Sequence, residues 1–108
     1  MKWKVGKSKI HGNGVFAAKD VEKNEDLGLA IPMVKDTSQH RMFQRNTFGL
    51  LINDSDSPNV KVVKKDDGWH FVSVRPIKED EEIVVQYQDY LDKVDLESFI
   101  AGKRVSVI

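Results

Sequence analysis

The segment 53–59 (NDSDSPN) combines residue types and a position that suit the binding of a small polar ligand. A run of turn-forming residues is most often a surface turn. Here it follows directly on the apolar run 48–52 (FGLLI), which indicates that the segment starts at the edge of the core. An asparagine amide in that place donates and accepts hydrogen bonds. It therefore suits a ligand that carries both an amino group and a carboxylate.

Two other features are weak on their own. Gly12-Asn13-Gly14 resembles a nucleotide loop, but it lacks the full GxGxxG pattern and lies between predicted strands, so by itself it predicts a plain turn. The acidic run 79–82 (EDEE) precedes a β-branched stretch that ends near Tyr87 and Tyr90. Such a run is usually a solvated face, and a tyrosine at a strand end usually packs its ring and leaves its hydroxyl in water.

Metal and nucleophile chemistry find little support in the sequence. The three histidines, His11, His40 and His70, lie far apart and have no partner at metal-ligand spacing, so no metal site is predicted. The absence of cysteine removes disulfides, zinc–thiolate sites and cysteine nucleophiles. A Ser/His/Asp triad remains open, although no nucleophile-elbow motif supports one.

Short strands between turns must position these residues. A chain of 108 residues fits one domain, 1–108. Apolar or alternating runs predict strands within 3–10, 15–18, 27–34, 60–65, 69–75 and 83–87, and Asp66-Asp67-Gly68 predicts a hairpin between two of them. The segment 35–47 fits a loop or one or two helical turns, and 94–101 fits a short helix that ends at Gly102. The periodicity therefore predicts a mainly β domain.

The charge balance limits the classes of partner. Seventeen Lys and Arg residues balance seventeen Asp and Glu residues, which disfavours direct nucleic-acid binding. No apolar run reaches the roughly 20 residues of a membrane-spanning helix, and the start of the chain does not resemble a secretory signal. We therefore expect a soluble intracellular protein, cytoplasmic or nuclear, that is not secreted and does not bind a membrane.

Three segments, taken in order, resemble the motifs of the SET domain, the protein-lysine methyltransferase fold. Segment 9–17 (KIHGNGVFA) is similar to the family's GxG-V-F-A, 52–59 (INDSDSPN) to F-N-H-S-x-x-P-N, and 77–87 (IKEDEEIVVQY) to I-x-x-G-E-E-L-T-x-x-Y. The resemblance covers about 5–90. It looks closest to the minimal SET proteins of large algal viruses, which also lack cysteine-rich flanking modules and carry a Phe-Gly step like Phe48-Gly49.

The resemblance implies a β-clip-like fold of short curved sheets with few short helices. Its C-terminal segment would thread under a loop as a pseudoknot and bring the Asn53 segment beside the Tyr87 segment. S-adenosylmethionine would bind on one face, and the substrate lysine would enter a narrow channel from the other.

The resemblance also implies a role for each matching residue. Tyr87 would be the catalytic tyrosine. The backbone at Asp54 would meet the adenine, and Asn53 would bind the methionyl end of the cofactor. The remaining cofactor contacts would come from the backbone around Gly12, Asn13, Gly14, Val15 and Phe16. The lysine channel would be lined by Phe48, Ile52 and Tyr90.

Three residues depart from the family's pattern. Asp54 replaces the usual His, Asp80 the usual Gly and Val84 a common Thr. Aspartate is among the residues that best tolerate a positive φ, if the position of Asp80 demands one. The loss of the imidazole at Asp54 raises the question of whether catalysis survives.

Three functions stay open at this point. The first is a protein-lysine N-methyltransferase that acts on a protein or peptide with an accessible lysine, such as a histone or histone-like protein. The second is a catalytically degenerate SET-like module that binds a peptide or partner. The third is a β-rich interaction domain in which the motifs are accidental. The viral resemblance also allows a homodimer, with Val105, Val107 and Ile108 as one contact.

Overall fold

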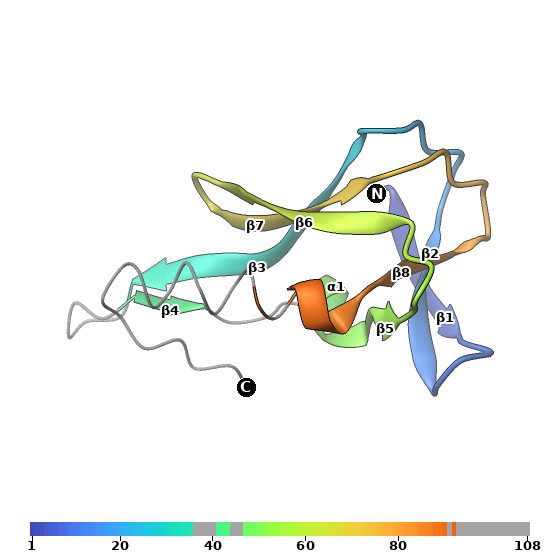
Figure 1. The fold of residues 1–108 in the computed structure, drawn as a ribbon, viewed down its shortest axis with the longest axis horizontal. Helices are drawn as coiled ribbons and strands as arrows, with labels where there is room; N and C mark the ends of the chain where they lie inside the picture. The colour runs from blue at the N-terminus through green and yellow to red at the C-terminus, as the bar shows by residue number, and fades with distance from the viewer. Residues whose placement is uncertain (36–40, 44–46, 91, 93–108) are drawn as a thin grey trace.

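The computed structural model describes residues 1–35, 41–43, 47–90 and 92, and it contains two four-stranded sheets (Figure 1). The predicted helix at 94–101, the stop at Gly102 and the apolar end 105–108 lie outside the described residues. The mainly β class is confirmed. The segment 35–47, for which we expected a loop or one or two helical turns, contains more β-structure than expected, because β3 reaches Lys35 and Arg41–Phe43 forms β4.

The first sheet holds the segments that carry the motifs. Its hydrogen-bonded order is β1 (Trp3–Lys7), β2 (Asn13–Ala17), β8 (Glu82–Val85) and β5 (Asn53–Asp54). β2 is antiparallel to both of its neighbours, whereas β5 runs parallel to β8. Three regions that are distant in the sequence, 3–17, 53–54 and 82–85, thus meet in one sheet.

The second sheet provides the larger face of the core. Its order is β4 (Arg41–Phe43), β3 (Asp26–Lys35), β7 (Gly68–Ser73) and β6 (Val60–Lys65). The predicted hairpin is confirmed, because Lys65 pairs with Gly68 and leaves Asp66-Asp67 as a two-residue loop. Gly68 has φ of 137°, a value that glycine adopts without a side-chain clash.

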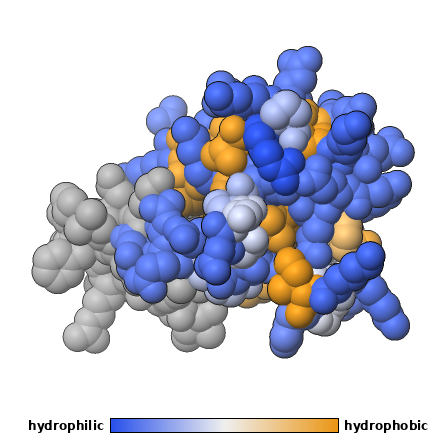
Figure 2. Space-filling view, turned by 45° about the vertical axis from the view of Figure 1, so that its right-hand side comes forward, coloured by the Kyte–Doolittle hydropathy of each residue, from blue (hydrophilic) through white to orange (hydrophobic). Residues whose placement is uncertain are grey.

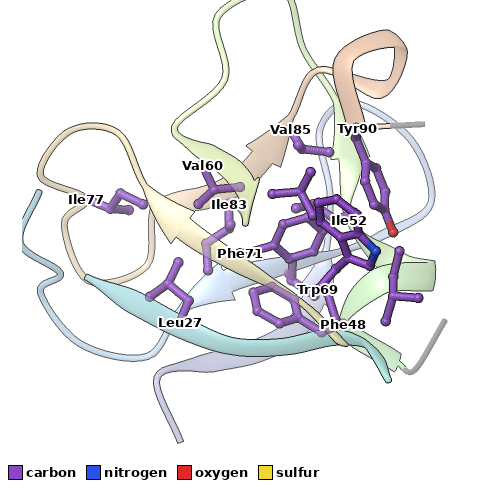
Figure 3. Close-up of a cluster of buried hydrophobic side chains, with 14 of the residues drawn as sticks. Leu27, Phe48, Ile52, Val60, Trp69, Phe71, Ile77, Ile83, Val85 and Tyr90 are labelled. Atoms are coloured by element: carbon purple, nitrogen blue, oxygen red, sulfur yellow. The ribbon is translucent and has the colours of Figure 1, made fainter. Parts of the chain in front are cut away.

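An aromatic cluster packs the two sheets together (Figure 3). Phe48 lies on α1 (Thr47–Leu51), the one helix with bounds in the described chain, and its ring stacks on Trp3 of β1 with centroids 4.6 Å apart. Phe71 of β7 meets Phe48 and Tyr90 edge-on, at 4.8 and 5.4 Å. Such pairs add to the stabilisation from buried apolar area. The apolar run 48–52 therefore lies mostly in α1, and it places Phe48 and Ile52 in the core.

Two matching turns connect the sheets. Asn24 and Asp80 are the non-glycine residues with positive φ in the described chain, at 65° and 69°. Each is the third residue of a turn, 22–25 or 78–81, that a backbone hydrogen bond of 3.3 or 3.0 Å closes. The residues before the two turns, Val21 and Ile77, form an antiparallel bridge. Asp80 thus takes the positive φ that its match to a family glycine suggested.

The surface that Figure 2 shows is mostly hydrophilic, with hydrophobic residues in small separate patches. In the part of the chain that the structure describes, no helix is long and apolar enough to cross a membrane.

Candidate functional site

A short parallel strand pair brings two of the predicted motifs together. Asn53 lies opposite Val84 and Asp54 opposite Val85 where β5 meets β8. Because Tyr87 follows β8 by two residues, it lies beside the same segment. The expected juxtaposition of the Asn53 and Tyr87 segments is therefore present in the structure.

Asn59 holds this junction from the other side. Its side chain is 1% exposed. Its Nδ2 donates to the carbonyl of Glu82 and its Oδ1 accepts from the Val84 N–H, each at 2.8 Å. Without this amide, two backbone groups in the core would lack partners, which is costly. This function of the Asn59 side chain was not predicted from the sequence, although its place between a turn and an apolar strand was a usable signal.

The Asn53 side chain joins β5 to the turn before β2. Its Nδ2 lies 3.2 Å from the carbonyl of His11, 3.3 Å from that of Asn13 and 2.9 Å from Oε2 of Glu82. All three partners are acceptors, so the amide nitrogen must face them. Asn53 thus links the glycine turn to β8.

Glu82 completes a small polar cluster that was not predicted from the sequence. The Ser8 hydroxyl lies 2.8 Å from both carboxylate oxygens of Glu82. The same hydroxyl accepts from the backbone N–H groups of Ile10 and His11, at 2.9 and 3.3 Å. Glu82 therefore contacts both Asn53 and the turn 8–13. It is half-buried and belongs to the site rather than to a solvated face.

Glycine is needed at positions 12 and 14 of the turn for two different structural reasons. Gly12 has φ of 46°, and a Cβ built there would meet no atom within 4 Å. Gly14 is a close approach: a Cβ would lie 2.5 Å from Oε2 of Glu82 and 2.9 Å from Nδ2 of Asn53. Gly12 thus serves the turn, whereas Gly14 makes room for the polar cluster.

Tyr87 is anchored to the segment 52–54 at two points. Its hydroxyl donates to the carbonyl of Ile52 at 2.5 Å, and its N–H donates to Oδ1 of Asp54 at 2.8 Å. The residue stays 38% exposed. A tyrosine whose hydroxyl is fixed and which is still partly exposed suits a residue that handles a substrate.

The residues predicted to line a lysine channel lie in the core. Phe48, Ile52 and Tyr90 are all buried, and Tyr90 Oη lies 3.5 Å from the carbonyl of Gly49. Ile52 touches the site through its carbonyl, which accepts from Tyr87. Their place in a channel stays a prediction. Val15 is buried in the same core, and Phe16 is half-buried.

Glu81 has a structural function next to the site. Its carboxylate pairs with Arg75 at 2.5 Å and accepts from the Lys78 N–H at 3.1 Å. The Arg75 hydrogen bond is the main reason why the pKa of Glu81 lies below its usual range. The acidic run thus divides between a residue that holds a turn and Glu82, which faces the site.

Within the described residues, no group of His, Asp or Glu side chains is arranged to hold a metal ion.

Comparison by sequence finds no matching family model and no matching curated protein. Comparison by structure finds clear matches. A candidate histone methyltransferase of Plasmodium falciparum superposes with a TM-score of 0.61 at 26% identity, over 80% of this chain and 92% of that chain. The SET domain of the tumour suppressor RIZ1 (PRDM2) gives a TM-score of 0.54 at 13% identity, over 92% and 80% of the two chains.

A chain of Polycomb Repressive Complex 2 from Chaetomium thermophilum also matches, with a TM-score of 0.61 at 18% identity. The match covers 89% of this chain and 17% of that chain, so it concerns a small part of the larger protein. These likenesses show that the chain has the SET-domain fold. The particular closeness to viral minimal SET proteins stays a prediction.

Proposed function

We propose that the protein is a protein-lysine N-methyltransferase that transfers a methyl group from S-adenosylmethionine to a lysine side chain. The observation that carries the proposal is the segment 52–54. Within a SET fold, it contacts the glycine turn through Asn53 and the tyrosine through Ile52 and Asp54.

The residues present fit this cofactor. Gly14 has no side chain to push the Asn53 amide away from the turn, since a Cβ there would lie 2.9 Å from Asn53 Nδ2. Asn53 Oδ1 accepts from no donor among the described residues and is therefore available to an amino group. When bound, S-adenosylmethionine supplies a methyl group on a positively charged sulfur. The groups that would hold it are the backbone of Gly12, Asn13, Gly14, Val15 and Phe16, the Asn53 amide and the backbone of Asp54.

The chain's own residues must orient the amine and exclude water. A lysine ammonium has no lone pair, so the amine must be neutral at the moment of transfer, against an ordinary pKa of about 10.4. A desolvated channel favours the neutral form. In this proposal Phe48, Ile52 and Tyr90 form the apolar wall, and the Tyr87 hydroxyl aligns the amine. Alignment is the main contribution that such a site makes to a direct displacement.

The proposed substrate is a protein or peptide with an accessible lysine, in the first instance a histone or histone-like protein. The structural likeness to a candidate histone methyltransferase supports this class. A homodimer is a further part of the proposal, which sedimentation of the purified protein tests. The alternative is a peptide-binding module without turnover, which would not transfer a methyl group from the cofactor to the peptide.

The test is calorimetric titration with S-adenosylmethionine, followed by transfer of a labelled methyl group to core histones. We expect a Kd below about 1 mM, equivalent to about 4 kcal/mol, and its loss in Asn53→Ala. We expect Tyr87→Phe to bind the cofactor and to lose methyl transfer. Cofactor binding without transfer to any lysine substrate would favour the binding module. A folded wild-type protein that binds no cofactor would contradict the proposal.

A further inference from the structure

Among the described residues, the carboxylate of Glu82 has only neutral hydrogen-bond donors. Ser8 Oγ lies 2.8 Å and Asn53 Nδ2 lies 2.9 Å from the carboxylate oxygens of Glu82. No Lys or Arg of the described chain forms an ion pair with this carboxylate. The neighbouring Glu81, by contrast, pairs with Arg75. A half-buried carboxylate that forms no ion pair with a described Lys or Arg therefore lies directly behind the Asn53 amide.

This arrangement determines which end of the amide faces outward. If the amide turned over, Oδ1 would face the carboxylate and the carbonyls of His11 and Asn13, all of which are acceptors. The observed orientation directs Oδ1 away from them. Asn53 is a buried residue, 7% exposed, but the only side-chain polar atom in the described chain that is both fully buried and unpaired is Trp69 Nε1, so Asn53 Oδ1 keeps some solvent contact.

We infer that Glu82, held by Ser8, is a positioning residue for cofactor selection. It fixes the Asn53 amide so that an acceptor faces the ligand, and its charge lies behind that acceptor. Together they favour a ligand with a cationic amino group over one that lacks it. This inference rests on the proposed function and adds to it the residue that sets the preference for the amino-acid end of the cofactor.

The test uses two ligands that differ only in that group. One is S-adenosylhomocysteine, and the other is its deaminated analogue, in which hydrogen replaces the α-amino group. We expect the wild-type protein to bind the first at least about tenfold more tightly, as for one hydrogen bond to a charged group. In Glu82→Gln, which keeps the shape and removes the charge, this preference falls toward one.

Glu81→Gln is the matched control, because it removes the adjacent carboxylate, which faces Arg75, and it should keep the preference. Ser8→Ala removes only the hydroxyl and should reduce the preference in the same direction, so it decides the question if Glu82→Gln does not fold. A folded Glu82→Gln that keeps the full preference, or that loses both ligands equally, overturns the inference and leaves the proposed function intact. A wild-type protein that binds neither ligand overturns both.

Discussion

The Tyr87 N–H donates a 2.8 Å hydrogen bond to the carboxylate of Asp54. Asp54 stands where SET domains usually carry a histidine, and the resemblance alone left its side chain without a function. In the structure, this side chain fixes the backbone of the proposed catalytic tyrosine. The substitution therefore supplies a contact of its own.

Removal of this carboxylate should loosen Tyr87. We expect Asp54→Ala to lower the free energy of unfolding by about 1 kcal/mol, the usual contribution of a hydrogen bond, and to lower methyl transfer. Asp54→Asn keeps an acceptor oxygen and should stay close to wild type. Urea denaturation and amide hydrogen exchange at Tyr87 measure the effect. Equal exchange in wild type and Asp54→Ala would contradict the anchoring function.

Substitutions at Gly12 and Gly14 should separate an effect on stability from an effect on cofactor binding. A Cβ at Gly14 would collide with Glu82 and Asn53, so Gly14→Ala should displace the Asn53 amide and weaken S-adenosylhomocysteine at least about tenfold. Gly12→Ala places a Cβ in open space at a positive φ. It should cost about 1 kcal/mol of stability with a smaller loss of affinity. Urea denaturation and calorimetry of both variants measure the two effects. The reverse order of affinities would show that the Gly14 contact is unimportant.

Sequence patterns predicted the local structure better than the site. The two-residue loop at Asp66-Asp67 was predictable because turn residues and alternation are local signals. The meeting of Asn53 with Tyr87 came only from family resemblance, since a two-residue parallel strand carries no periodicity. The inward position of Glu82 was not predicted either, because the apolar residues that follow it in β8 do not alternate with polar ones and so do not mark one face of the strand.

The two turns with positive φ predict opposite effects for glycine and alanine. Asn24 and Asp80 tolerate the left-handed region better than alanine, and glycine tolerates it best. We expect Asn24→Ala to lower the free energy of unfolding by about 1 kcal/mol and Asn24→Gly to leave it equal or raise it by about 0.5 kcal/mol. Asp80→Ala and Asp80→Gly should show the same order.

Both Asp80 variants also lose the exposed ion pair between Asp80 and Lys4, which lowers their free energy of unfolding further. Asn24 is therefore the cleaner site for this test. Thermal and urea denaturation of the four variants measure the effect. The φ-based explanation would be wrong if alanine proved more stable than glycine at Asn24.

His70 should make stability depend on pH. Its Nδ1 lies 3.1 Å from Asp26 and its Nε2 lies 2.6 Å from Asp67, so only the protonated ring donates to both carboxylates. Burial alone would lower the pKa of His70, but the hydrogen bonds to Asp67 and Asp26 outweigh it and raise the pKa above 6.5. The Lys65 ammonium, 2.6 Å from Asp26, faces the same cluster.

The direction of the pH dependence of stability follows from the raised pKa of His70. Because the pKa is higher in the folded state, the stabilisation is complete below the ordinary value of about 6.5 and is lost as the pH rises through the folded value. His70→Gln removes the titration and keeps hydrogen-bonding capacity. The free energy of unfolding of wild type minus that of His70→Gln should therefore be larger at about pH 5.5 than at about pH 8.5. Urea denaturation at both pH values measures the difference, and a value that does not change with pH would show that His70 keeps its ordinary pKa in the folded protein.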